Sequence, residues 1–161
     1  MSDDQQSSGL ARALLRIPVP WVFVLTYLVG VGLEPVFQLG KLINYRALTP
    51  TGTAVFAIGA ALAGWGWLTF HHVGTTRVPG ETSTALVTWG PYRFTRNPMY
   101  LGLSVAYLGE AGILHHVLPV ILLPLTIAYL NRVVIPVEEN RLKADFGVEY
   151  ASYTNRVGRW L

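Results

Sequence analysis

Residues 90–102 read Gly-Pro-Tyr-Arg-Phe-Thr-Arg-Asn-Pro-Met-Tyr-Leu-Gly, a polar and cationic segment that leads directly into an apolar one. Its opening Gly-Pro pair predicts a turn, and Asn97 followed by Pro98 is typical of a helix N-cap and the first helical residue. A helix is therefore expected to begin near Pro98. Arg93 and Arg96 lie just before this start, where free backbone N–H groups and the positive end of the helix dipole also attract anions. The segment predicts an anion-binding site.

The composition indicates a membrane protein. Of the 161 residues, 52% are hydrophobic and 13% are charged, whereas an ordinary soluble domain has about 25% charged residues. The net charge of +3 comes from cationic residues scattered around apolar segments, unlike the basic tract of a nucleic-acid-binding protein. The absence of cysteine excludes disulfides and thiolate metal sites. The first residues are polar and acidic rather than typical of a signal peptide, so the first apolar segment is expected to remain as a membrane anchor.

Four apolar segments are long enough, or nearly so, to cross the hydrocarbon core, which takes about 20 helical residues. We expect an all-α, integral membrane helical bundle forming a single domain, residues 1–161, with spans at about 20–39, 51–70, 99–114 and 117–137. A C-terminal amphipathic helix should follow, because Leu142, Phe146 and Tyr150 recur at every fourth position among charged residues.

The second apolar segment contains small residues at a spacing typical of helix contacts. Gly59 and Ala63 are four positions apart, as are Ala60 and Gly64. Such pairs allow helix backbones to approach closely in a bilayer. The pattern therefore predicts that this segment packs tightly on another span.

Four spans would place both termini and the polar residues 71–97 on one side of the membrane. That side carries nearly all arginine and lysine residues, whereas only Lys41 and Arg46 lie opposite. By the positive-inside rule this side is cytoplasmic. We therefore expect a multi-pass protein of the cell membrane, embedded in the lipid bilayer, with cytoplasmic N- and C-termini. Its two polar segments, at about 74–102 and 132–159, should meet at that face.

The second polar segment begins where the fourth span ends. Arg132 and Glu139 are seven positions apart and would share one face of a regular helix, so they could form an ion pair. Glu138 stands beside Glu139, which places two carboxylates next to each other at the membrane surface. Ionisable groups at this depth usually face protein or water rather than lipid.

Two blocks of residues carry a resemblance to a known family. The first block is 90–93 with 96–102, and the second comprises Glu138, Glu139, Leu142, Phe146, Gly147, Tyr150, Tyr153 and 157–159. In this order, and separated by a hydrophobic hairpin, the blocks resemble the isoprenylcysteine carboxyl methyltransferase family, which is related to the membrane phospholipid N-methyltransferases. The resemblance covers roughly residues 74–161. Asn97 stands where eukaryotic-type members usually carry His, and it keeps hydrogen-bonding ability without a titratable group.

The resemblance implies an integral membrane enzyme that transfers a methyl group from S-adenosylmethionine to a lipid-like or small apolar acceptor. In such families the first block and the adjacent glutamates form the cofactor pocket on the cytoplasmic side, and no metal is expected. The candidate cofactor-binding residues are Tyr92, Arg93, Arg96, Asn97, Pro98, Tyr100, Gly102, Glu138, Glu139 and Tyr150. The candidate catalytic residues are Glu139 and Arg132.

The chemistry of S-adenosylmethionine agrees with these residue types. Its carboxylate could be held by Arg93 or Arg96. Its ammonium group or ribose hydroxyls could be held by either glutamate, and its ring or sulfonium by Tyr92, Tyr100 or Tyr150. A carboxylate acceptor needs no general base. An amine acceptor must first lose a proton, for which one of the two glutamates is the better candidate.

Other interpretations stay open at this level. A phospholipid amine is an alternative acceptor, and Arg93 and Arg96 could bind anionic lipid headgroups instead of a cofactor. Membrane reductases related to steroid reductases share a similar C-terminal pattern and would use NADPH. A small four-helix transporter would need a carboxylate in the middle of the first span, whereas Glu34 lies towards the end of that span. The oligomeric state is left open.

Overall fold

The computed structural model describes residues 18–37, 39, 48–72 and 85–161. Its helices are α2 (Val19–Phe37), α3 (Leu48–His72), α4 (Pro98–Leu114), α5 (Leu118–Tyr129) and α6 (Ile135–Thr154), with a 3-10 turn, η3 (Gly90–Arg93), and a π turn, η4 (Leu130–Val134). This architecture confirms the predicted all-α fold, and α4 begins at the predicted Pro98. The N-terminal segment, Lys41, Arg46 and most of the polar region before residue 85 lie outside the described residues.

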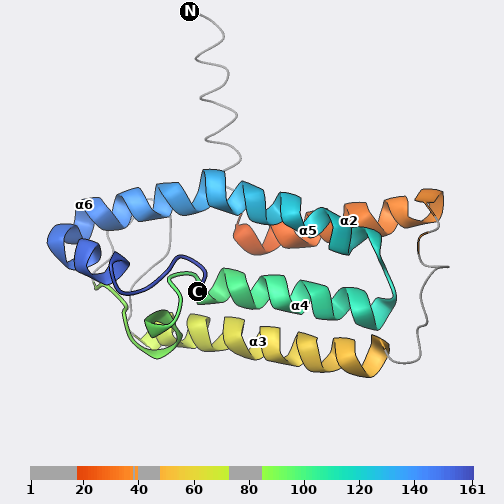
Figure 1. Ribbon diagram of the computed structural model, residues 1–161, viewed down its shortest axis with the longest axis horizontal. Helices are drawn as coiled ribbons and strands as arrows, with labels where there is room; N and C mark the ends of the chain where they lie inside the picture. Colours follow the sequence, from red (N-terminus) through yellow and green to blue (C-terminus); the bar gives the residue numbers. More distant parts are fainter. Residues whose placement is uncertain (1–17, 38, 40–47, 73–84) are drawn as a thin grey trace, which may run out of the picture.

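The helices associate in two pairs, α3 with α4 and α2 with α5 (Figure 1). Within the described residues, three helices are long and apolar enough to cross a membrane: α2, α3 and the continuous helix Leu118–Thr154. α4 has 17 residues and lies along α3, so it supplies a shorter fourth apolar segment. The predicted integral membrane helical bundle is confirmed.

Glycine residues bring α3 and α4 into close contact. A Cβ added at Gly59 would lie only 2.7 Å from the carbonyl oxygen of Gly102, and it would also meet the backbone of Ala106. Gly102 in turn faces the backbone of Ala63. The prediction that Gly59 and Ala63 lie at a close helix contact is therefore confirmed. Gly64 has no neighbouring atom within 4 Å of an added Cβ, so it lies off this interface.

The α3–α4 interface repeats at intervals of seven residues. Gly52, Gly59 and Gly66 are buried on α3, and Gly102 and Gly109 are buried on α4. Because these positions lack side chains, the two backbones are in direct van der Waals contact. The tight pair fixes the start of α4 beside the end of α3, which is where residues 90–97 are placed.

α2 is joined to α5 by close packing and by a carboxylate. Gly30 lies directly against Pro119. Glu34 Oε2 accepts a hydrogen bond from the backbone N–H of Leu118 at 2.7 Å, at the N-terminal end of α5. A negative charge there also interacts favourably with the helix dipole. Glu34, which interrupts the first apolar segment of the sequence, therefore has a structural partner.

The fourth apolar segment and the amphipathic helix form one continuous helix. α5, η4 and α6 follow one another from Leu118 to Thr154, so the backbone stays helical past Glu138, where the sequence pattern changes. It leaves helical geometry at Gly147, where φ is 44° and ψ is −113°. A positive φ of this kind is readily adopted by glycine, which has no Cβ. The bend in this helix is therefore set by glycine and not by the change from apolar to charged residues.

Beyond Gly147 the chain turns back, and the C-terminus lies near the start of α4 (Figure 1). Tyr150, Tyr153 and Val157 form a small core against which Leu142 and Phe146 pack. The predicted apolar face of the amphipathic helix is confirmed by this cluster. Its formation brings the C-terminal residues to residues 90–97.

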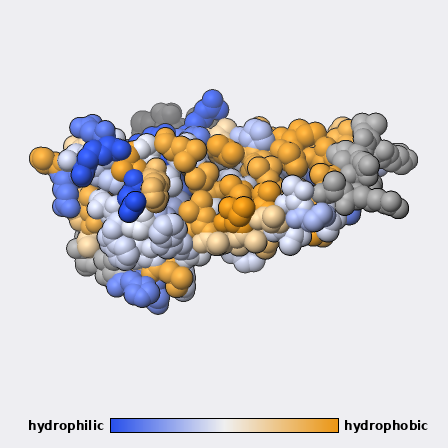
Figure 2. All heavy atoms as spheres, turned by 60° about the horizontal axis from the view of Figure 1, so that its bottom comes forward, coloured by the Kyte–Doolittle hydropathy of each residue, from blue (hydrophilic) through white to orange (hydrophobic). Residues whose placement is uncertain are grey.

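The outer surface of the bundle is apolar. Leu28, Ile58 and Leu125 are 59%, 64% and 66% exposed on α2, α3 and α5, respectively. Figure 2 shows hydrophobic residues along the length of the bundle and hydrophilic residues gathered at the end where α6 and the C-terminal segment lie. An apolar belt with one polar end is the surface expected of a protein that sits in a bilayer.

Candidate cofactor pocket

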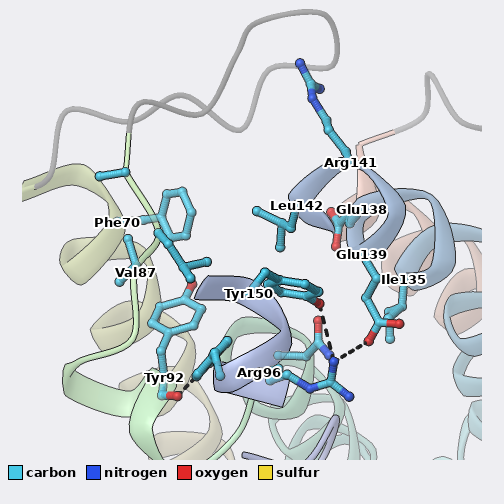
Figure 3. A pocket seen from close by; sticks show the side chains of 14 residues that line it. Phe70, Val87, Tyr92, Arg96, Ile135, Glu138, Glu139, Arg141, Leu142 and Tyr150 are labelled. Atoms are coloured by element: carbon cyan, nitrogen blue, oxygen red, sulfur yellow. Dashed lines mark hydrogen bonds and ion pairs between the residues drawn. The ribbon is translucent and has the colours of Figure 1, made fainter. Parts of the chain in front are cut away.

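A pocket lies at this polar end of the bundle, where α3 ends, α4 begins and α6 extends beyond the other helices (Figure 1), and Figure 3 shows the side chains that line it. It holds about 780 Å³ of empty space, part of which is open to solvent. It is lined by Phe70, Ala85, Leu86, Val87, Tyr92, Arg96, Asn97, Ile135, Glu138, Glu139, Arg141, Leu142, Tyr150 and Tyr153. Both polar segments of the sequence therefore contribute to one pocket.

Residues 90–97 fold into a compact turn that presents Tyr92 and Arg96 to the pocket. Gly90 has a φ of +62°, which permits the turn that enters η3. Tyr92 is only 3% exposed, and its carbonyl oxygen accepts a hydrogen bond from the Tyr153 hydroxyl at 2.7 Å. The backbone N–H of Arg96 donates to the carbonyl oxygen of Gly158 at 3.0 Å. Hydrogen bonds with the C-terminal part of the chain therefore hold this turn in place.

One carboxylate at the pocket is shared by two guanidinium groups. Arg96 Nη1 lies 3.0 Å from Glu139 Oε1. Arg159 donates to the same carboxylate twice, from Nε to Oε1 at 3.0 Å and from Nη2 to Oε2 at 2.6 Å. The Arg96 and Glu139 side chains are 16% and 12% exposed, and pairing with Glu139 raises the pKa of the Arg159 guanidinium. This Arg96–Glu139–Arg159 cluster keeps one net positive charge, which favours an anionic group nearby.

Two tyrosines extend this polar wall. Arg96 Nη1 donates a hydrogen bond to the Tyr150 hydroxyl oxygen at 3.3 Å (Figure 3). Tyr150 is only 1% exposed, so its ring is buried in the lining of the pocket. The hydroxyl of Tyr100, which does not itself line the pocket, donates a hydrogen bond to Glu138 Oε1 at 2.6 Å. Arg96 Nε is buried and has no hydrogen-bond partner among the described residues.

The last residues of the chain connect the two polar segments. The Arg159 carbonyl oxygen accepts hydrogen bonds from Asn97 Nδ2 at 2.9 Å and from Thr95 Oγ1 at 3.2 Å. Trp160 Nε1 donates to Asn131 Oδ1 at 2.9 Å, which ties the tail to η4. The tail therefore lies between the turn before α4 and the long helix, and fixes both relative to the pocket.

Asn97 precedes α4 as predicted, but its side chain does not cap the helix. The side chain is directed to the C-terminal tail instead, and its burial is consistent with that contact. The N-cap interpretation of this side chain is therefore wrong. An apolar residue at position 97 would remove the hydrogen bond that the Asn97 side chain donates to the Arg159 carbonyl oxygen.

The structure separates the predicted site residues into two groups. Those that line the pocket are Tyr92, Arg96, Asn97, Glu138, Glu139 and Tyr150. Those that do not are Arg93, Pro98, Tyr100, Gly102 and Arg132. Among these, Pro98 starts α4, and Gly102 belongs to the helix contact with Ala63.

Arg132 and Glu139 do not form the predicted ion pair. Glu139 is held by Arg96 and Arg159, whereas the Arg132 side chain is exposed. The physical reason is the π turn at Leu130–Val134, which contains Arg132. A π turn takes more residues than an α turn, so positions seven apart no longer share the face that they share in a regular helix.

Arg159 pairs with Glu139 but was not among the candidate site residues predicted from the sequence. It belongs to the second motif block, but its distance of 20 positions from Glu139 gives no sign of their pairing. Tyr153 stands in the same block and lines the pocket. The apolar wall formed by Phe70, Val87 and Leu142 carries no sequence signal of its own, because such residues are common throughout this chain.

Comparison with known proteins agrees with the resemblance seen in the sequence. The model of a family described as phospholipid methyltransferase matches residues 48–149. The solved structure of the eukaryotic intramembrane Ras methyltransferase ICMT (isoprenylcysteine carboxyl methyltransferase), without a monobody, is similar with a TM-score of 0.65 and 27% sequence identity. The alignment covers 87% of this chain and 50% of that chain, so this chain spans about half the length of that structure. No curated protein matches the chain.

Proposed function

The chain belongs to the phospholipid methyltransferase family, and from this premise we propose that it binds S-adenosylmethionine in the pocket and methylates a lipid-like or small apolar acceptor. The observation that carries the proposal is the convergence of Arg96 with Glu138 and Glu139 on one partly enclosed pocket at the end of an apolar bundle. Neither polar segment alone would form such a site.

The residues of the pocket fit the groups of this cofactor. Arg96 Nε is a buried donor without a partner among the described residues, and it suits a carboxylate. Glu138 suits an ammonium group or ribose hydroxyls. The rings of Phe70 and Tyr92, with the apolar side chain of Leu142, suit an adenine ring. The donor set therefore matches the anionic, cationic and aromatic parts of the molecule.

When bound, S-adenosylmethionine supplies a methyl group on a sulfonium, ready for in-line displacement. The contribution of the chain is to align the reactants and to exclude water. We assign Glu139 to positioning, because two guanidinium groups hold its carboxylate in place. Arg132 is exposed and outside the lining, so the proposal gives it no catalytic role.

Calorimetric binding to the detergent-purified full chain tests the proposal directly. S-adenosylmethionine and its demethylated product, S-adenosylhomocysteine, should both bind, whereas NADPH measured in parallel should not. Binding of NADPH alone would instead support a membrane reductase. Transfer of a labelled methyl group into lipid extracts, followed by separation of the products, would then identify the acceptor class.

Arg96→Lys is expected to weaken S-adenosylmethionine binding about tenfold or more, because lysine cannot reproduce the planar fork of donors that Arg96 directs to Glu139 and to the pocket. Arg93→Lys is the matched control, since Arg93 lies three positions earlier but outside the lining. Its affinity should stay within about twofold of the parent. Equal losses in both variants would contradict the assignment of Arg96 to the site.

We also propose that the pocket end faces the cytoplasm. All arginine and lysine residues of the described part belong to the segments that surround this end: Arg93, Arg96, Arg132, Arg141, Lys143, Arg156 and Arg159. The positive-inside rule supports a cytoplasmic position for them.

A single introduced cysteine tests this orientation, because the chain has none of its own. Val148 is 87% exposed and directly follows the Gly147 bend in α6, so V148C should react with a membrane-impermeant maleimide in inverted membrane vesicles but not in intact cells or spheroplasts. Labelling in intact cells would reverse the proposed orientation. Detergent-solubilised V148C serves as the control for reactivity.

A further inference from the structure

Arg93 lies outside the pocket lining although it is only three positions before Arg96. Its side chain is exposed, and its guanidinium carbon lies 4.6 Å from the centre of the Phe94 ring. Within the described residues, Arg93 takes part in no ion pair. A cation held over an aromatic face keeps its charge available for an external anion.

Exposed aromatic side chains occur in and next to the turn that contains Arg93. Trp89 is 52% exposed and Phe94 is 55% exposed, one on each side of η3. Trp65 and Trp67, in the later part of α3, are 48% and 54% exposed. The indole nitrogen of Trp65 would lie 3.6 Å from a Cβ added at Gly90, so this part of α3 and the turn are adjacent.

The position of this group is that of a membrane interface. Tryptophan is enriched where the hydrocarbon meets the headgroups, because its ring is apolar while its N–H remains available to polar partners. α3 is an apolar helix long enough to cross the membrane, and η3 contacts it at the pocket end. An exposed guanidinium at this level would face the phosphate layer of the bilayer.

We infer that Arg93, Trp89 and Phe94 form a binding site for the headgroup of an anionic phospholipid, outside the cofactor pocket. The guanidinium supplies the charge for the phosphate, and the two aromatic side chains supply apolar surface for the glycerol and upper acyl region. A bilayer lipid fits better than a soluble anion, because more than half of each ring is exposed beside a membrane-spanning helix.

The proposed lipid site lies on the same turn that contributes Arg96 to the pocket. Residues 90–97 carry Arg93 on the outer side and Arg96 on the pocket side. A lipid bound to Arg93 would therefore contact the same turn that presents Arg96 to Glu139. This inference does not depend on the methyl-transfer proposal, because it concerns a surface that no pocket residue shares.

Native mass spectrometry of the detergent-purified full chain, titrated with phosphatidylglycerol or phosphatidylcholine, tests this site. The parent should retain phosphatidylglycerol preferentially, and Arg93→Gln should lower that affinity about fivefold, the usual contribution of one basic residue near an anionic membrane. Arg156→Gln is the matched control, because Arg156 is also exposed but lies beyond α6. It should change the affinity by less than about twofold.

Three outcomes would overturn the inference. One is equal retention of the two lipids by the parent, and another is an equal loss of phosphatidylglycerol in both glutamine variants. The third is displacement of phosphatidylglycerol by inorganic phosphate at a similar concentration, which would identify a site for free anions. Calorimetry of S-adenosylmethionine binding to Arg93→Gln adds a separate check, since a large loss there in a folded variant would return Arg93 to the cofactor site.

Discussion

Gly59→Ala should destabilise the protein by about 3 kcal/mol, the upper part of the range for overpacked cores. The added Cβ would meet the backbone of Ala106 and lie 2.7 Å from the carbonyl oxygen of Gly102. Backbone atoms on both helices cannot move aside as a flexible side chain can, so α3 and α4 would have to separate. Thermal unfolding in detergent, followed by tryptophan fluorescence, measures the loss.

Gly64→Ala provides the control for this experiment. Gly64 lies five positions further along α3 and has no atom within 4 Å of an added Cβ. Alanine is favoured over glycine in a helix by about 1 kcal/mol, so helix propensity alone predicts that both variants are stabilised. If Gly59→Ala lowers the stability while Gly64→Ala raises it, the helix contact at Gly59 outweighs helix propensity. A stable Gly59→Ala protein would mean that the helices are less closely packed than described.

The fold was predictable because its determinants lie along the chain. The lengths of the apolar segments defined the helices, and the Asn97-Pro98 pair placed the start of α4. Which helices pack against each other was harder to predict from the sequence. A row of glycines marks a helix face without side chains, but it does not identify the helix that packs on that face. Gly59 and Ala63 were identified, whereas the facing Gly102 was attributed to the cofactor site.

The site was predictable to the extent that its residues stand in the two motif blocks. The sequence identified Arg96, Glu139 and Tyr150, but it could not separate Arg93 from Arg96, since both are cations in one short polar segment. Only the folded turn places one inside the pocket and the other outside. The possible ion pair between Glu139 and Arg132 was inferred from a regular helix, and the π turn invalidates that assumption.

Glu139→Gln is expected to lower both the stability of the protein and its affinity for the cofactor. The substitution removes the carboxylate that neutralises Arg96 and Arg159, and it leaves two guanidinium groups facing each other. Removing one partner of a buried ion pair costs about 3–5 kcal/mol. The cost here should be about 2–3 kcal/mol, because the Arg159 side chain is 35% exposed and partly solvated. S-adenosylmethionine affinity should fall about tenfold or more as Arg96 loses its orientation.

Glu149→Gln is the matched control, because Glu149 is an exposed carboxylate on the same helix. The stability of this variant should stay within about 0.5 kcal/mol of the parent.

A double-mutant cycle with Arg159→Gln then separates two roles for Glu139. If Glu139 positions Arg96, stability and cofactor affinity will fall together, and Arg159→Gln will restore part of the stability in the Glu139→Gln background by removing an unpaired charge. If Glu139 contacts the cofactor directly, the stability restored by Arg159→Gln will bring no recovery of cofactor affinity.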